Sequence, residues 1–206
     1  MTDSKLLELA RMIEGWPGLT AGPPGPLIED SLVLLDHLGD AVWVVDVGSG
    51  GGLPGLPLKI SRPDLELTLI EADQAKAAFL VQACAKLGLT DVDVVALRAE
   101  DAGHDSRYRE RFDVAVARAL APLPVLVELS LPLVRVGGRL LAQKTLAESV
   151  GAAHRAIELL GGRLVEVAEA QSAARETGTV VVIERIGPTP DGYPRRAGIP
   201  SRKPLK

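Results

Sequence analysis

The residues in this sequence that are best placed to do chemistry surround a glycine-dense turn. An apolar run that begins at Val42 is closed by Asp46, and the glycines that follow are Gly48, Gly50, Gly51, Gly52 and Gly55. Because glycine lets the backbone turn sharply and approach a ligand closely, this pattern predicts a nucleotide-type binding turn between a buried strand and a helix. The competing interpretation is a tight strand-to-helix turn that binds nothing.

The charges around the turn narrow the choice of ligand. Three of its glycines satisfy GxGxxG, the pattern of dinucleotide-binding folds. However, the carboxylate of Asp46 would repel a pyrophosphate and attract an ammonium group. Pro54 also removes one N–H from the first helical turn, where anions are held. These features favour S-adenosylmethionine, with its α-ammonium, sulfonium and ribose diol, over NAD. We therefore expect Asp46, Gly50, Gly52 and Glu71 to contact that cofactor.

Length and composition favour one globular domain. The chain has 206 residues, of which 47% are hydrophobic, enough for one well-buried core. No apolar run reaches the length needed to cross a bilayer, and the charged N-terminus does not resemble a signal peptide, so we expect a cytoplasmic protein. Cys84 is the single cysteine and its apolar neighbours indicate a core position. The histidines are far apart in the sequence and predict no metal site.

Charge is distributed unevenly along the chain. The formal net charge is −4, but the last fourteen residues carry +5 and no acid, which leaves −9 for the residues before them. The cations of this tail are Arg195, Arg196, Arg202, Lys203 and Lys206. Three prolines lie among them, so the composition predicts an extended segment with its charges outward. We expect these cations to contact RNA phosphates, and Tyr193 could stack on an exposed base. The alternative is a solvated, disordered end.

Strand and helix patterns alternate along most of the chain. The predicted strands are the run from Val42, Leu65–Glu71, Asp93–Leu97, Phe112–Ala117, 139–144, Arg163–Ala170 and Thr179–Arg185. The predicted helices are 3–14, Leu27–Leu38, the segment opened by Pro54, Gln74–Leu87, Leu123–Val134 and Leu146–Leu160. Such alternation indicates a doubly wound α/β fold with a mainly parallel sheet. No helix separates the last two strands, so they should pair antiparallel as a hairpin.

We interpret the chain as a single domain over residues 1–206 with three parts. Residues 1–40 form a short helical N-terminal segment, interrupted by a Gly/Pro-rich linker over 16–26 that cannot be regular structure. Residues 41–187 form the catalytic core, and 188–206 form the basic C-terminal tail. A parallel sheet with a terminal hairpin and a cofactor turn after its first strand is typical of class I methyltransferases, with seven strands.

Several stretches together resemble one family, the bacterial small-subunit (16S) ribosomal RNA methyltransferase G family, also called glucose-inhibited division protein B. The matching stretches are DVGSGGGLPGLPLKI at Asp46, LIEAD with Lys76 and FL at Phe79, LRAED at Arg98, FDVAVARALAPL at Phe112, GGRLLAQK at Gly137, and YPRRAGIPSRKPL at Tyr193. They span residues 46–205 in order. The resemblance implies methylation of N7 of a guanosine in small-subunit ribosomal RNA, with S-adenosylmethionine as the methyl donor.

The resemblance also implies roles for individual residues. Gly48 and Leu53 match positions that line the cofactor, Ala99 and Glu100 match the pair beside its adenine, and Arg118 matches an arginine of the cofactor site. Arg118 could instead form a structural ion pair with Asp113 or Glu100, and Glu71 could be a solvated helix cap.

Lys144 matches a basic position of the family that could meet RNA phosphate, although a solvated lysine is a close alternative. Two departures lie towards the substrate side. The family's histidine shortly before DSL is missing, with Gly22–Pro26 in place of a polar connection, and the usual glycine after Lys144 is Thr145.

Methyl transfer from a sulfonium to guanine N7 needs alignment of the two groups rather than a catalytic base, which agrees with the lack of a His–Asp or Cys–His pattern. The expected partner is small-subunit ribosomal RNA or the assembling small subunit, and the expected state is a monomer with no membrane association. Three other interpretations stay open at this point. They are a class I methyltransferase of a small molecule or protein, an NAD-dependent oxidoreductase, and a non-catalytic RNA-binding module.

Overall fold

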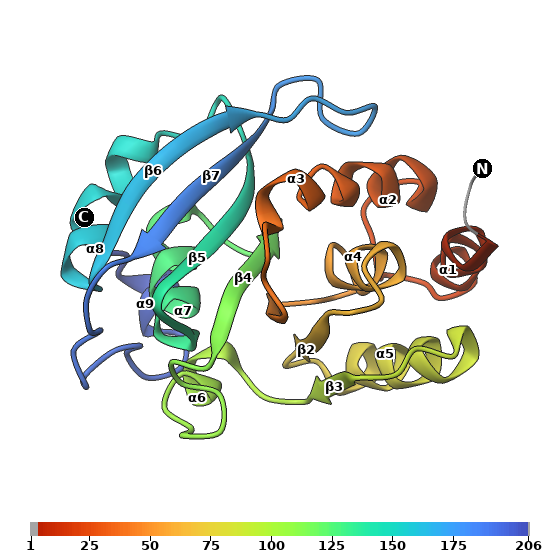
Figure 1. The fold of residues 1–206 in the computed structure, drawn as a ribbon, viewed down its shortest axis with the longest axis horizontal. Helices are drawn as coiled ribbons and strands as arrows, with labels where there is room; N and C mark the ends of the chain where they lie inside the picture. The colour runs from red at the N-terminus through yellow and green to blue at the C-terminus, as the bar shows by residue number, and fades with distance from the viewer. Residues whose placement is uncertain (1–3, 206) are drawn as a thin grey trace.

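The computed structural model describes residues 4–205, and within them seven strands form one sheet in the order β3-β2-β1-β4-β5-β7-β6. Strands β1 to β5 run parallel, whereas β7 pairs antiparallel with both β5 and β6. Figure 1 shows the long β6–β7 hairpin completing one side of the sheet. The strands are β1 Trp43–Val47, β2 Glu66–Ile70, β3 Val92–Val95, β4 Phe112–Arg118, β5 Val134–Thr145, β6 Gly162–Glu169 and β7 Gly178–Arg185. The predicted mainly parallel sheet and the terminal hairpin are confirmed.

The central strands β1, β4 and β7 are covered on both faces, as expected for apolar runs rather than alternating ones, whereas the edge strand β6 is mostly exposed. Side chains of β1 point into two separate hydrophobic clusters, with Val44 in one and Val45 in the other. Helices α4 Gly55–Ser61 and α5 Gln74–Leu87 pack in the first cluster. Helices α7 Leu123–Ser130 and α8 His154–Leu159 pack in the second. This packing fixes the carboxyl ends of the parallel strands along one edge.

The N-terminal segment adds three helices to the α4 and α5 side of the sheet (Figure 1). They are α1 Ser4–Glu14, α2 Pro24–Leu32 and α3 Leu35–Leu38. Helix α2 begins inside the linker predicted over 16–26, because proline at the first helical positions needs no N–H donor and has a helical φ. Residue 3 of the predicted first helix lies outside the described residues.

Two predicted helices are shorter than expected. Helix α7 ends at Ser130 and continues only as the 3₁₀ turn η1 Leu131–Leu133, because Pro132 has no N–H to donate. The segment predicted as one helix over Leu146–Leu160 contains the 3₁₀ turn η2 Val150–Ala153 and then α8. Strand β5 is correspondingly longer than predicted.

The C-terminal tail is folded onto the core, which corrects the expectation of an extended segment. Arg195 donates its Nε and Nη2 to the buried Glu128 of α7 at 2.8 and 2.6 Å. The short helix α9 Ile199–Arg202 follows and lies near α7 (Figure 1). A buried carboxylate needs a charged or hydrogen-bonded partner, and Arg195 supplies it. Lys206, one of the predicted tail cations, lies outside the described residues.

Within residues 4–205, no helix is long and apolar enough to span a membrane.

Candidate functional site

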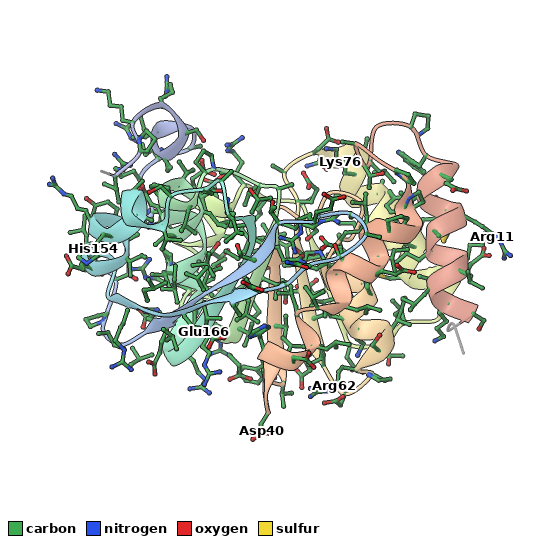
Figure 2. All side chains as sticks on the ribbon, turned by 90° about the horizontal axis from the view of Figure 1, so that it is seen from above. Arg11, Asp40, Arg62, Lys76, His154 and Glu166 are labelled. Atoms are coloured by element: carbon green, nitrogen blue, oxygen red, sulfur yellow. The ribbon has the colours of Figure 1, made fainter. Side chains whose placement is uncertain are left out.

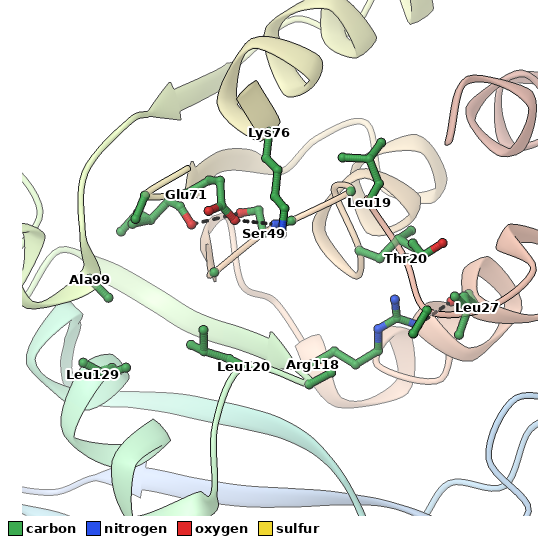
Figure 3. A pocket seen from close by; sticks show the side chains of 18 of the residues that line it. Leu19, Thr20, Leu27, Ser49, Glu71, Lys76, Ala99, Arg118, Leu120 and Leu129 are labelled. Carbon is green, nitrogen blue, oxygen red and sulfur yellow. Dashed lines mark hydrogen bonds between the residues drawn. The ribbon is translucent and has the colours of Figure 1, made fainter. Parts of the chain in front are cut away.

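A cavity of about 600 Å³ opens where the parallel strands end. The segments after β1, β2, β3 and β4 form its walls, together with residues before and within α2. Figure 3 shows Ala99 and Leu129 at one end of the cavity and Thr20, Leu27 and Arg118 at the other. We call one the leucine end, formed by Leu97, Ala99, Glu100, Leu120 and Leu129, and the other the arginine end, formed by Thr20, Leu27, Asp30, Arg118 and Arg175. A cavity at the carboxyl ends of parallel strands is where open α/β sheets bind ligands.

The glycine turn lies between the two ends. Gly50 has a φ of +54° and its N–H donates to Glu71 Oε2 at 2.8 Å. A side chain is strained in this left-handed conformation, so the turn requires glycine here. Gly48, Gly50 and Leu53 line the cavity, as predicted for cofactor contacts, whereas Gly52 packs against Leu56 of α4 and does not line it.

Asp46, predicted as a cofactor contact, lies behind the cavity wall rather than on it. The side chain is fully buried, and Oδ2 accepts a hydrogen bond from the N–H of Gly55 at 2.8 Å. Burial raises the pKa of Asp46 to about 7, against the lowering effects of the Gly55 N–H and the charge of Arg118. Asp46 Oδ2 therefore holds the start of α4 under the glycine turn, while Oδ1 is buried without a hydrogen-bond partner among the described residues.

Glu71 is the carboxylate that the structure does place at the cavity. Its Oε2 accepts from Gly50 N and its Oε1 accepts from Asp73 N, both at 2.8 Å. Asp73 in turn caps α5 by accepting from the N–H groups of Ala75 and Lys76. Each carboxylate oxygen has a second lone pair, so a carboxylate oriented in this way can still accept hydrogen bonds from a diol.

The arginine end is held by ion pairs rather than by backbone N–H groups. Arg118 Nη1 donates to Leu27 O at 3.2 Å and lies 3.8 Å from Asp30 Oδ2 (Figure 3). The structural alternative for Arg118, a pair with Asp113 or Glu100, is not what the structure shows. Asp113 accepts from Arg135 at 2.7 Å, and Glu100 accepts from Arg98 at 3.2 Å.

The leucine end has apolar walls and one acidic residue. Leu120 packs so closely on Gly48 that an added Cβ there would lie 2.4 Å from it. Glu100 Oε1 accepts from the N–H of Gly198 in the tail at 2.8 Å. Burial pushes the pKa of Glu100 up, but hydrogen bonds from Gly198 and Arg98 outweigh burial, so that pKa lies below its ordinary value. The tail therefore reaches the wall of the cavity.

Some of the residues predicted to bind RNA are bound to other groups of the protein, and others are exposed. Lys144 is buried and donates to Ala121 O at 2.5 Å, beside Glu148 Oε2 at 2.9 Å, so it is not the free lysine that was expected. Arg195 is bound to Glu128 and its Nη2 to Lys203 O. Tyr193 is half-buried, and its carbonyl accepts from Arg109 at 2.8 Å. The side chains of Arg196, Arg202 and Lys203 are exposed.

Sequence reasoning missed several residues of the cavity. Lys76 extends from α5 towards the glycine turn, and Thr20 faces the turn from the N-terminal segment (Figure 3). Lys76 belongs to a stretch that matched the family, so a signal for it was present. Asp30 begins the sequence DSL, which the family shares, but nothing local shows that Arg175, 145 residues away, binds it.

Comparison with known protein families and sequences gives one consistent result. Residues 26–177 match the model of the family described as rRNA small subunit methyltransferase G. A relative with the name ribosomal RNA small subunit methyltransferase G from Roseiflexus castenholzii is 49% identical over 164 residues, which cover 79% of this chain and 70% of the relative. One from Moorella thermoacetica with the same name is 45% identical over 182 residues, covering 86% of this chain and 76% of the relative.

Solved structures with low sequence identity share the fold. The mitomycin 7-O-methyltransferase MmcR has a TM-score of 0.62 at 16% identity, and the match covers 79% of this chain and 55% of the MmcR chain. The O-methyltransferase TomG from Streptomyces achromogenes, in complex with SAM, has a TM-score of 0.59 at 20% identity, covering 91% and 92%. The Thermus thermophilus 16S rRNA N2 G1207 methyltransferase, in complex with AdoMet and guanosine, has a TM-score of 0.53 at 17% identity, covering 78% and 39%. The predicted class I methyltransferase fold is confirmed.

Proposed function

Because the chain belongs to the rRNA small subunit methyltransferase G family, we propose that it methylates N7 of a guanosine in small-subunit ribosomal RNA. The protein is an S-adenosylmethionine-dependent methyltransferase. The observation that carries the assignment to this site is Glu71, held between the glycine turn and the start of α5 on the wall of the cavity at the carboxyl ends of the strands. The choice of guanosine and of its N7 atom is our inference from the family.

The donor set of the cavity fits S-adenosylmethionine. Glu71 offers lone pairs to a ribose diol, and the leucine end offers apolar contact to an adenine beside Ala99. Arg118, with a guanidinium at the opposite end, would bind the carboxylate of the methionine part. Asp46, placed beneath the turn, would hold the turn's conformation rather than contact the cofactor.

When bound, S-adenosylmethionine supplies an electrophilic methyl group on its sulfonium sulfur. The residues of this chain have to hold the acceptor in line with that methyl group and keep water out. Guanine N7 has a lone pair in the neutral base, so no residue has to remove a proton first.

The exposed cations of the tail are the proposed contacts to RNA phosphates. Arg196, Arg202 and Lys203 lie on a segment that is anchored to the core by Arg195 and to the cavity wall by the Gly198–Glu100 hydrogen bond. Phosphate contacts need accessible cations near the site of chemistry. The fold supports that role for these three residues, while Arg195 acts as their anchor and Lys144 as a structural residue.

The experiment uses small-subunit particles and naked ribosomal RNA from a strain that lacks the gene. Each is incubated with the full chain and labelled S-adenosylmethionine, then digested and analysed by mass spectrometry. The expected result is N7-methylguanosine at one position, absent with the Gly50→Val variant. Transfer to another atom or nucleoside would overturn the N7 assignment. Binding of S-adenosylhomocysteine without any transfer to RNA would instead indicate a different methyl acceptor.

A further inference from the structure

The connection between β6 and β7 reaches across to the N-terminal helices (Figure 1) and brings two side chains onto Asp30 of α2. Ser172 Oγ donates to Asp30 Oδ1 at 2.6 Å. Arg175 Nε lies 2.9 Å from both carboxylate oxygens, and its Nη1 donates to the carbonyls of Lys144 and Thr179. The buried carboxylate of Asp30 is therefore already occupied by groups from the hairpin.

This occupation has a consequence for Arg118. Its Nη1 is 3.8 Å from Asp30 Oδ2, which is within ion-pair distance but beyond hydrogen-bond distance. Within the described part of the chain, the hydrogen bond found for its guanidinium goes to Leu27 O, and a guanidinium has five N–H donors. The side chain is largely buried, and both Arg118 and Arg175 line the cavity around the single carboxylate of Asp30. The arginine end therefore carries one positive charge more than Asp30 neutralises.

The surroundings of Arg118 act on its pKa in opposing directions, and burial, which lowers it, has the largest effect. Burial lowers the pKa of Arg118, the carboxylates of Asp30 and Asp46 raise it, and the charge of Arg175 lowers it further. A buried guanidinium with an incomplete set of partners binds an incoming carboxylate well, because little has to be broken to receive it.

We propose that Arg175 and Ser172 are positioning residues that hold Asp30 away from Arg118, so that Arg118 stays free to bind the carboxylate of the cofactor's methionine part. The proposal rests on the function proposed above for Arg118. Without Arg175, the Asp30 carboxylate would lose its principal cation, and the nearest remaining cation is Arg118. A buried carboxylate without a partner is costly, so Asp30 and Arg118 would close into a direct pair. The cofactor would then have to break that pair before binding.

The test compares two ligands on the full chain by calorimetry. S-adenosylhomocysteine has the amino-acid part, whereas 5′-methylthioadenosine has the nucleoside and sulfur without it. We expect Arg175→Met to lower the affinity for S-adenosylhomocysteine about tenfold and to leave that for 5′-methylthioadenosine within about twofold. Ser172→Ala should shift the affinity ratio in the same direction by less. The double variant Asp30→Asn/Arg175→Met should restore the ratio, because a neutral amide in place of the carboxylate no longer forms an ion pair with Arg118.

Each outcome decides between the proposals. Equal losses for both ligands in Arg175→Met would mean that Arg175 only supports the fold, and an unchanged ratio would mean that Arg118 does not depend on the hairpin. Either result overturns the positioning role. If the wild-type chain binds the two ligands equally, the assignment of Arg118 to the carboxylate is wrong instead. If Arg175→Met does not fold, the ratio of the two ligand affinities in Ser172→Ala decides whether the positioning role holds. That variant loses one hydroxyl and keeps the Arg175–Asp30 ion pair, so it should fold.

Discussion

Two parts of the cavity, the glycine turn with Glu71 and the arginine end, are held in place by different means. The glycine turn and Glu71 are joined by hydrogen bonds that span 2 and 21 residues of sequence and involve backbone N–H groups. The arginine end is joined by side chains, and its contacts span 91 to 145 residues. Backbone donors are fixed as soon as the strands and α5 have formed. The ion pairs, by contrast, exist only when the N-terminal helices, β4 and the terminal hairpin all pack together.

This difference suggests how substitutions in the glycine turn and at the arginine end differ in their effect on ligand binding. A change in the turn alters the backbone that orients the ligand, so it should affect every ligand that uses the nucleoside part. A change at the arginine end removes a guanidinium or changes its position, so it should affect only ligands with a carboxylate. The predictions below separate these two kinds of effect, beginning with the largest.

The largest effect is expected beneath the turn, where Asp46→Asn should change how stability depends on pH. Burial raises the pKa of Asp46 to about 7, whereas the ordinary value of 3.8 applies when the chain is unfolded. The folded state therefore binds the proton more tightly, and stability falls as pH rises from about 4 through 7. The unfolding free energy of the wild type should therefore fall, relative to that of Asp46→Asn, by on the order of 3 kcal/mol between pH 5 and 8.

Urea unfolding of both proteins across that range measures the difference. Parallel profiles for the two proteins would show that the Asp46 carboxylate titrates as an ordinary one.

In the turn itself, Gly50→Val should lower the affinity for S-adenosylhomocysteine and for 5′-methylthioadenosine about a hundredfold each. The φ of +54° is strained for a β-branched residue, and relaxing it moves the N–H that orients Glu71. Calorimetry with both ligands gives the two ratios.

Gly25→Val is the matched control, because that exposed glycine of α2 does not line the cavity and has open space around it. Equal affinities in Gly50→Val and wild type would show that the turn is only a connection.

At the arginine end, Arg118→Ala should lower the affinity for S-adenosylhomocysteine about tenfold and leave 5′-methylthioadenosine unaffected. The reason is that only the first ligand has a carboxylate for the guanidinium. Thermal unfolding of the ligand-free chain serves as the control, since Arg118 makes few contacts of its own. A large drop in melting temperature with unchanged affinity would favour a purely structural arginine.

The smallest effect on either end of the cavity is expected from the exposed tail cations. Changing Arg196, Arg202 and Lys203 to serine should leave both ligand affinities intact while lowering the salt slope of RNA binding by about 2. Nitrocellulose or fluorescence binding at several salt concentrations measures that slope, and methylation of small-subunit particles should fall with it.

The matched control removes the same charge elsewhere, at the exposed Arg11, Arg155 and Arg163 on α1, α8 and β6. Figure 2 places Arg11 on α1 and His154 on α8 at opposite ends of the molecule. An equal change in slope from both triple variants would show that the tail has no special part in RNA binding.

The order of strands and helices and the place of the cavity follow from local patterns. Apolar runs and the glycine turn need only their own neighbours, because strand and helix periodicity and backbone conformation act over a few residues. Helix α5 was predicted with the bounds that it has, from its own apolar stripe. Helix α2 was not, because the prolines that exclude a helix interior also suit a helix start.

The sequence by itself determined the family, the sheet, the glycine turn and the acid after β2, since these depend on residue types at short spacing. Only the tertiary structure decided which charged side chains are free. Asp46 and Lys144 stand at strand ends as ligand-binding residues do, yet both are buried against backbone groups. In the sequence, Arg195 is one of several equivalent tail cations. In the structure it anchors the tail to the core, because Glu128 lies buried beneath it. Whether a charged side chain faces a ligand depends on whether another group of the protein binds it. The packing between segments far apart in the chain decides that.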